Sequence, residues 1–425
     1  MTDLRRAAEL CEFCPKMCRF ACPVSEAASR EALTPWGKVS LAALTGRAPD
    51  ASAALAFAGC TGCLRCQVYC AHANDVPAVL YAARAGAVRA GTAPRGWAAI
   101  AARMTAAGHT ETADLLAIHR RIAAEERKSS TSTSTSNSTT TPTSTSTPTS
   151  TPITSSTGTT PTPIRRSALK AAIAARAPGF LRAPREPAVP QPLLFAGCDA
   201  LAAGGRLARE ALAVARALDA PLSLAPEAAL CCGLKLAEAG HPELFGAHAA
   251  RVRSALVGPA RKPGPVHLVF LSPGCARAVR ERWPALPPGS RAEHATSYLA
   301  RALSARPDLR DRPPLAGAAV WHDPCELARG LSELTAPRAL LAAAVEEVRE
   351  PVRSGADTSC CGAAGLLPRT LPEVAAAVAE DRRRELSACG APAVTASPAC
   401  AAALGAEDVI AVLARWLGVA IEREP

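Results

Sequence analysis

The stretch Cys60-Thr-Gly-Cys63-Leu-Arg-Cys66-Gln-Val-Tyr-Cys70 carries four cysteines at the spacing C-x2-C-x2-C-x3-C. Three thiolates on such a tight loop can cover one face of a [4Fe–4S] cluster, and a more distant fourth thiolate closes it. A second run, Cys11-x2-Cys14-x3-Cys18-x3-Cys22-Pro23, nearly repeats the pattern. Zinc is the alternative, because C-x2-C pairs also suit zinc, but zinc sites usually take two close pairs separated by a longer loop. The two runs therefore favour iron–sulfur sites.

The order of the cysteines also predicts which of them act together. In two-cluster ferredoxins the fourth cysteine of each run ligates the other cluster. We therefore expect each run to exchange its last cysteine with the other. One [4Fe–4S] cluster is then expected on Cys11, Cys14, Cys18 and Cys70, and the other on Cys60, Cys63, Cys66 and Cys22.

Two further groups of four cysteines follow, and each contains an adjacent pair before a glycine. They are Cys198, Cys231, Cys232 and Cys275, and then Cys325, Cys360, Cys361 and Cys400. The first cysteine precedes its doublet by 33 positions in one group and by 35 in the other. The text before the last cysteine also recurs, as SPGC against SPAC. Such recurrence predicts two copies of one metal-binding unit. Of the 17 cysteines only Cys389 belongs to none of the four groups, and we expect it to be an inert helical residue.

Length, composition and charge narrow the class of protein. At 425 residues the chain can form two or three domains. Its start does not resemble a signal peptide, and no run of about 20 apolar residues is present. We therefore expect a cytoplasmic protein whose reduced thiols bind metal, with peripheral attachment to the inner membrane face left open. The formal charge of +11 can compensate anionic clusters or bind an acidic partner, whereas the thinly spread basic residues argue against nucleic acid.

A segment rich in Ser, Thr and Pro divides the cysteine groups two and two. Residues 127–165 include the text STSTSTSNSTTTPTSTSTPTSTP and are predicted to be a disordered linker. Residues 1–126 are expected to form an all-α domain with two [4Fe–4S] clusters, and residues 190–310 and 311–425 two α/β repeats. The repeats are expected because short apolar runs at 192–196, 266–271, 318–321 and 393–396 each lead into a cysteine.

With these motifs in view, the N-terminal part resembles the α-helical ferredoxins of succinate dehydrogenase iron–sulfur subunits and of heterodisulfide reductase. The second part resembles the cysteine-rich CCG domain of heterodisulfide reductase subunits and of glycolate oxidase iron–sulfur subunits. The residues that carry this second resemblance are Phe195-Ala-Gly-Cys198, Cys231-Cys232-Gly233, Ser272-Pro-Gly-Cys275, His322-Asp-Pro-Cys325, Cys360-Cys361-Gly362 and Ser397-Pro-Ala-Cys400.

The resemblance implies a further iron–sulfur cluster, or zinc, in one or both CCG repeats. In heterodisulfide reductase the motif closes with C-x-x-C, but Ser272 and Ser397 stand here where the first cysteine of that pair would be. This departure argues against cleavage of disulfides and points toward the glycolate and lactate oxidase branch. His322 and Asp323 could orient a ligand or could serve only the turn after a strand.

The sequence thus predicts an electron-transfer subunit of an oxidoreductase complex. By resemblance, its partner would be a flavoprotein that oxidises a 2-hydroxy acid of the glycolate or lactate type, and its acceptor a quinone or another carrier. No nucleophile–base set is recognisable, so the catalytic residues are unknown. Two alternatives stay open, which are a catalytic subunit of the heterodisulfide or thiol reductase type and a zinc-bearing scaffold protein.

Overall fold

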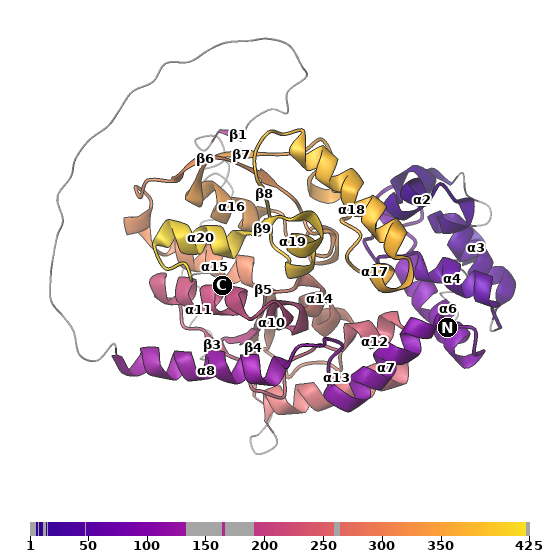
Figure 1. The fold of residues 1–425 in the computed structure, drawn as a ribbon, viewed down its shortest axis with the longest axis horizontal. Helices are drawn as coiled ribbons and strands as arrows, with labels where there is room; N and C mark the ends of the chain where they lie inside the picture. The colour runs from indigo at the N-terminus through magenta and orange to yellow at the C-terminus, as the bar shows by residue number, and fades with distance from the viewer. Residues whose placement is uncertain are drawn as a thin grey trace, which may run out of the picture.

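The computed structural model describes residues 6, 8–11, 14, 16–46, 48–132, 164–165, 191–258 and 264–421. The predicted linker lies outside these residues except at its two ends, because helix α8 extends to Ser132 and strand β1 covers Ile164–Arg165. Figure 1 shows a helical N-terminal part beside a larger part in which helices surround two sheets.

The described N-terminal part is helical throughout. Its elements are η1 (Met17–Ala21), α2 (Pro23–Ala28), η2 (Glu31–Leu33), α3 (Pro35–Thr45), α4 (Ala51–Ala58), α5 (Arg65–Val68), α6 (Val76–Arg89), α7 (Arg95–Ala107) and α8 (Leu115–Ser132). Side-chain caps start several of them, since Thr34, Asp50 and Asp75 accept backbone N–H groups of the first turns of α3, α4 and α6. Residues 26–44 do not form one helix, because Pro35 and its Thr34 cap start a new helix there.

The first repeat contains a four-stranded parallel sheet in the order β3-β2-β4-β5. Its strands are β2 (Leu193–Phe195), β3 (Ser223–Leu224), β4 (His267–Phe270) and β5 (Arg291–His294). The helices are α10 (Cys198–Ala202), α11 (Arg206–Ala217), α12 (Leu234–Glu238), α13 (Pro242–Val257), α14 (Pro273–Glu281) and α15 (Ala295–Ser304), followed by η3 (Pro307–Leu309). Between α10 and α11 the helical path is interrupted at Gly204 and Gly205, which adopt φ values of 81° and 72°.

The second repeat has the same strand order, β7-β6-β8-β9, with β1 added antiparallel to β7. Its strands are β6 (Leu315–Trp321), β7 (Val345–Arg349), β8 (Ala393–Thr395) and β9 (Glu407–Asp408). The other elements are η4 (Glu326–Gly330), α16 (Thr335–Ala344), η5 (Gly355–Asp357), α17 (Leu367–Thr370), α18 (Pro372–Ser387), α19 (Pro398–Leu404) and α20 (Val409–Leu417). A helix-rich chain with two small parallel sheets agrees with the expected combination of α and α/β parts.

The last two helices of the N-terminal part belong to the core of the first repeat. Trp97 and Ile100 of α7 and Leu115 and Ile122 of α8 are almost completely buried in one cluster with the strands β2 and β4. Figure 1 shows α8 lying along the first repeat, beside β3 and α11. The two parts of the chain therefore share apolar packing, and their contact does not depend on surface ion pairs alone.

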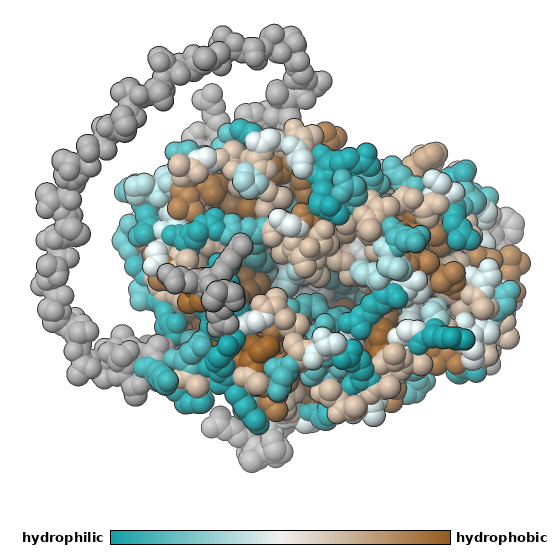
Figure 2. All heavy atoms as spheres, in the orientation of Figure 1, coloured by the Kyte–Doolittle hydropathy of each residue, from teal (hydrophilic) through white to brown (hydrophobic). Residues whose placement is uncertain are grey.

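None of the described helices is both long and apolar enough to cross a lipid bilayer. On the described part of the face drawn in Figure 2, apolar residues form separate patches between hydrophilic ones.

Candidate metal centres

All 17 cysteines are described and none forms a disulfide. We number the four groups as quartets. Quartet I is Cys11, Cys14, Cys18 and Cys70; quartet II is Cys22, Cys60, Cys63 and Cys66; quartet III is Cys198, Cys231, Cys232 and Cys275; and quartet IV is Cys325, Cys360, Cys361 and Cys400.

The thiols of quartets I and II are neighbours in the sets expected from the exchange of fourth cysteines. Burial, followed by the nearby thiols of quartet I, raises the pKa of Cys18 to about 11. Burial likewise raises the pKa of Cys66, followed by the other three thiols of quartet II. The structure therefore brings Cys70 to the first run and Cys22 to the second. Thiols held together in this way repel one another when ionised, and a bound cation relieves that repulsion.

A local turn repeats at one cysteine of each quartet. The backbone N–H two residues after the cysteine lies 3.3–3.4 Å from its sulfur, and the residue that carries this N–H adopts a left-handed φ of 61–80°. The pairs are Cys14 with Lys16, Cys60 with Gly62, Cys231 with Gly233, and Cys360 with Gly362. Hydrogen bonds of this kind stabilise the thiolate, which is the form that binds metal. The geometry of all four sites thus fits a metal-bound group.

Quartet II lines a cavity of its own. All four of its cysteines border this cavity together with Lys38 of α3. The Lys38 Nζ donates to the Gly59 carbonyl oxygen at 2.7 Å and lies 3.8 Å from the Cys22 sulfur. Burial lowers the pKa of Lys38, but the thiols of quartet II outweigh burial and raise it overall. A buried ammonium beside four thiols fits a cofactor with net negative charge.

The thiols of quartet I are contacted by an amide group, where those of quartet II have an ammonium group beside them. The Asn74 side chain donates from Nδ2 to the Cys11 sulfur at 3.1 Å, and the Asn74 backbone N–H lies 3.5 Å from the sulfur of Cys70. Nearby, the side chains of Met17 and Phe20 are exposed.

Quartet III lies at the carboxyl ends of β2 and β4. The sulfurs of Cys198 and Cys231 are 3.7 Å apart, and Cys232 is a neighbour of Cys275. The Lys235 Nζ lies 2.7 Å from Glu111, 2.8 Å from Asp199 and 4.0 Å from the Cys198 sulfur. This cation and its two carboxylates were not predicted, because Glu111 comes from the N-terminal part of the chain.

Quartet IV occupies the matching place at the ends of β6 and β8. Its sulfurs form two close pairs, Cys325 with Cys360 at 3.9 Å and Cys361 with Cys400 at 3.3 Å. One ring nitrogen of His322 lies within 4.8 Å of the sulfurs of Cys361 and Cys400. His322 is therefore part of the surroundings of this site, whereas the first repeat has Phe195 at the corresponding position.

The protonation of His322 follows from its neighbours. Burial holds its pKa well below the usual range, and the guanidinium groups of Arg382 and Arg329 act in the same direction, so the ring is neutral. The Arg382 Nε–H donates to His322 Nδ1 at 3.0 Å, which leaves the ring proton on Nε2. Nε2 is buried and has no hydrogen-bond partner among the described residues. A neutral ring with Nε2–H is suited to donate to a sulfur of a bound group.

Asp323, by contrast, has a structural role. Its carboxylate accepts from Arg338 at 2.7 Å, from the Trp321 indole at 2.9 Å and from the Gly355 backbone at 2.7 Å. Of the two residues singled out before Cys325, only His322 faces the thiols.

The two serines that replace cysteine stand at the starts of helices. Ser272 is the N-cap residue of α14 and makes no side-chain cap, whereas the Ser397 Oγ accepts from the Cys400 backbone N–H at 3.5 Å at the start of α19. Ser397 therefore supports the helix that carries the last thiol of quartet IV.

Quartets II and IV meet across the seam between the two parts of the chain. Cys63 and Cys360 are in side-chain contact, and the thiol of Cys360 donates to the Thr61 hydroxyl oxygen at 3.5 Å. Arg329 of the second repeat donates to the Cys63 carbonyl oxygen at 2.5 Å. A Cβ added at Gly365 would lie 2.2 Å from the carbonyl oxygen of Cys60. The loop of quartet II is therefore seated directly on the second repeat.

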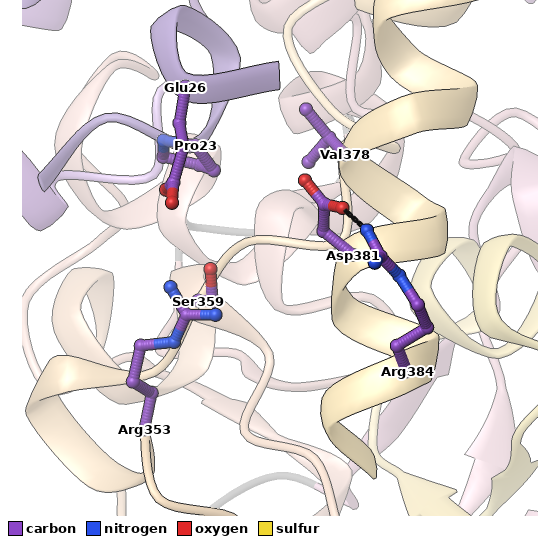
Figure 3. Close-up of a pocket in the computed structure, with 7 residues that line it drawn as sticks. All are labelled: Pro23, Glu26, Arg353, Ser359, Val378, Asp381 and Arg384. Atoms are coloured by element: carbon purple, nitrogen blue, oxygen red, sulfur yellow. Dashed lines mark hydrogen bonds and ion pairs between the residues drawn. The ribbon is translucent and has the colours of Figure 1, made fainter. Parts of the chain in front are cut away.

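A cavity of about 280 Å³ lies along the same seam. Figure 3 shows Glu26 of α2 facing Ser359 and the α18 residues, with Asp381 ion-paired to Arg384. The full lining is Pro23, Glu26, Arg353, Ser359, Val378, Asp381 and Arg384. Two of its lining residues are sequence neighbours of quartets II and IV, because Pro23 follows Cys22 and Ser359 precedes Cys360. Its two cations and two carboxylates balance, so its charge favours neither an anion nor a cation.

The sites of the two repeats are also close to each other. A Cβ at Gly274, beside Cys275, would lie 2.5 Å from the carboxylate of Glu326, which follows Cys325. Burial, followed by the carboxylate of Glu238, raises the pKa of Glu326 to about 7. No sequence pattern marked Glu326, Lys38 or Lys235, because each is significant only through neighbours that are distant in the chain.

Comparisons with known proteins cover part of the chain, and the family match contains quartet IV. Residues 319–405 match the cysteine-rich domain family CCG. The chain is 29% identical over 244 residues to one component of the dihydromethanophenazine:CoB–CoM heterodisulfide reductase of Methanosarcina barkeri, covering 53% of this chain and 58% of that protein. It is 26% identical over 250 residues to the same component of the Methanosarcina acetivorans enzyme, covering 54% and 59%. The chain thus spans little more than half of the length of these relatives. The CCG match and these similarities support an iron–sulfur subunit of an oxidoreductase, with cysteine-rich CCG architecture.

Proposed function

We propose that this chain is the electron-transfer subunit of a redox complex and that its four quartets hold the carriers. The observation that carries the proposal is the contact of Cys63 with Cys360, which seats quartet II against quartet IV. When bound, iron–sulfur clusters would supply one-electron transfer at these sites. Quartets I and II would hold [4Fe–4S] clusters, and quartets III and IV a further iron–sulfur cluster or zinc.

The chain itself connects the sites. Each N-terminal cysteine run contributes to both quartets I and II, so these two sites are neighbours by covalent connection. Quartet II touches quartet IV, and Gly274 and Glu326 connect the surroundings of quartets IV and III. The order I, II, IV, III is therefore the sequence of contacts through which the subunit would pass charge.

For the donor and acceptor we propose a flavoprotein that oxidises a glycolate- or lactate-type 2-hydroxy acid, and a quinone or another carrier. Ser272 and Ser397 support this assignment, because each repeat then offers four thiols and lacks the fifth of the disulfide-cleaving type. Placement in the cytoplasm, with or without peripheral contact with the inner membrane face, belongs to the same proposal.

A heterodisulfide or thiol reductase subunit is the second candidate, and the similarity to heterodisulfide reductase components favours it. Lys235 beside Cys198 and the protonatable Glu326 between the two repeats would suit the delivery of charge and protons to a sulfur substrate. Both candidates require the same quartets, and they differ in the reaction at quartets III and IV.

The test begins with anaerobic purification from the native host. About eight or more irons per chain with matching acid-labile sulfide are expected, whereas zinc alone would establish the scaffold alternative and overturn the proposal. A co-purifying flavoprotein and reduction of the chain by glycolate or lactate would support the first candidate. Turnover of a heterodisulfide by the isolated chain with a chemical reductant would instead establish the second.

A further inference from the structure

Lys38 occupies an unusual position for a lysine. Its residue is only 1% exposed, and its Nζ reaches the Gly59 carbonyl oxygen at 2.7 Å and the Cys22 sulfur at 3.8 Å. Among the residues that the structure describes, no carboxylate forms an ion pair with it. An ammonium group buried without an anionic partner has a high desolvation cost. The negative charge that compensates Lys38 must therefore come from quartet II and whatever it binds.

A neighbouring cation does not act equally on the two oxidation states of a cluster. Reduction adds a negative charge, so a fixed positive charge stabilises the reduced state more than the oxidised state. At 3.8 Å from a ligand sulfur and shielded from solvent, the Lys38 ammonium is poorly screened by salt. The expected consequence is a higher reduction potential at quartet II.

Quartet I provides the internal comparison. The Asn74 amide donates to Cys11, so this site receives a dipole where quartet II receives a full charge. Lys16 follows Cys14 closely in the chain, but its Nζ lies 3.8 Å from the centre of the Trp36 ring, while its backbone N–H lies 3.3 Å from the Cys14 sulfur. The two N-terminal sites, although built from similar cysteine runs, thus have different electrostatic surroundings.

We propose that Lys38 is a positioning residue that raises the reduction potential of the cluster held by quartet II, the site in contact with quartet IV. This inference rests on the proposed function, because it requires a cluster at quartet II. Lys38 thereby favours electrons at an N-terminal site that touches the second repeat. A purely structural Lys38 would only cap the end of α4 through Gly59, and such a role would leave the potential unchanged.

The test compares Lys38→Gln, which keeps a donor toward Gly59 without the charge, with Lys38→Arg, which keeps the charge. The full chain is titrated anaerobically, and the EPR signal of quartet II is identified by its loss in Cys66→Ser. We expect a shift to more negative potential in Lys38→Gln, a near-native potential in Lys38→Arg, and no shift in Lys16→Met. An unchanged midpoint in a fully iron-loaded Lys38→Gln protein would overturn the inference.

The inference about Lys38 can also be tested if a variant loses iron. If Lys38→Gln loses the iron of quartet II, Lys38→Met is titrated in its place. If both uncharged variants lose this iron while Lys38→Arg retains it, a requirement for the charge is supported; if Lys38→Arg shifts or loses iron as Lys38→Gln does, the inference is refuted. Absence of any cluster signal from the wild-type chain would instead refute the proposed function.

Discussion

The thiol of Cys360 donates to the hydroxyl oxygen of Thr61 at 3.5 Å, although 299 positions separate these residues in the chain. Thr61 lies between Cys60 and Cys63, and Cys360 opens the second doublet. One hydrogen bond thus joins the loop of quartet II to the loop of quartet IV. The proposed transfer of charge between the two parts of the protein would cross this seam, and several predictions concern it.

Replacing Cys63 by serine should remove one cluster and leave the rest. Cys63→Ser is expected to lower the iron content by about four per chain, to abolish electron passage and to leave the second part of the chain folded. Iron analysis and EPR after anaerobic purification measure this change. Cys389→Ser is the control, because the Cys389 thiol donates to the backbone carbonyl oxygens of Glu350 and Glu385 and its replacement should retain all iron. Full cluster content in Cys63→Ser would contradict the assignment.

Adding a methyl group at Gly365 should separate the two loops. Its Cβ would meet the Cys60 carbonyl oxygen at 2.2 Å and the Thr61 Cα at 2.6 Å, and both are backbone atoms that cannot move aside. Gly405→Ala is matched in backbone strain, since φ is +64° there and +69° at Gly365, but nothing lies near its Cβ. We expect Gly365→Ala to lower the free energy of unfolding by about 1–3 kcal/mol more than this control does.

Hydrogen exchange of residues 60–70 measures the effect of Gly365→Ala directly. Faster exchange in this loop is expected in Gly365→Ala and not in Gly405→Ala. Equal protection in both variants would show that the close approach of Gly365 to Cys60 does not hold the seam together.

The Asp357 carboxylate should make docking sensitive to acid. It accepts from Arg65 at 3.1 Å and from the Tyr69 hydroxyl at 2.6 Å. Burial raises the pKa of Asp357, but Tyr69 and Arg65 outweigh it, and the pKa lies below its usual value. Such a group stabilises the folded state above its unfolded pKa of about 3.9, and the contribution is lost as the pH falls through the lower folded pKa.

Because the Asp357 side chain is 40% exposed and partly screened by solvent, Asp357→Asn is expected to lower the free energy of unfolding by about 0.5–1 kcal/mol at neutral pH. The difference from wild type should shrink below about pH 4 as the wild-type carboxylate becomes protonated. Denaturant unfolding at several pH values measures this difference. Asp308→Asn, at an ion pair with Arg306 away from the seam, serves as the control. A constant difference down to about pH 2, below the usual range of an aspartate pKa, would argue against the ionised carboxylate as the cause.

Replacement by alanine should affect protein stability differently at Ser272 and at Ser397. Ser397→Ala removes the hydroxyl that accepts the Cys400 N–H, and it should lower the free energy of unfolding by about 0.5–1 kcal/mol. Ser272→Ala removes no cap and should leave the free energy of unfolding nearly unchanged. Denaturant midpoints and metal content are measured together. Both variants should keep their metal, and loss of metal in Ser397→Ala would show that its oxygen is a ligand.

The sequence predicted much of the local structure because its signals are short in range. The apolar runs before the cysteines became β2, β4, β6 and β8. Local signals also set several helix limits, such as Pro35 at the start of α3 and the Gly204-Gly205 pair before α11. The [4Fe–4S] clusters at quartets I and II, and the iron–sulfur cluster or zinc at quartets III and IV, stay predictions.

Cysteine spacing alone sorted 16 of the 17 cysteines into four quartets of two kinds, because the short runs and the doublets each recur along the chain. The tertiary structure decided which cation, amide or imidazole stands beside each quartet. Lys38, Lys235 and His322 act on thiols from other segments, and Cys63 meets Cys360 only after the two parts dock. Electrostatic effects follow distance in space, and folding sets that distance between residues far apart in the chain.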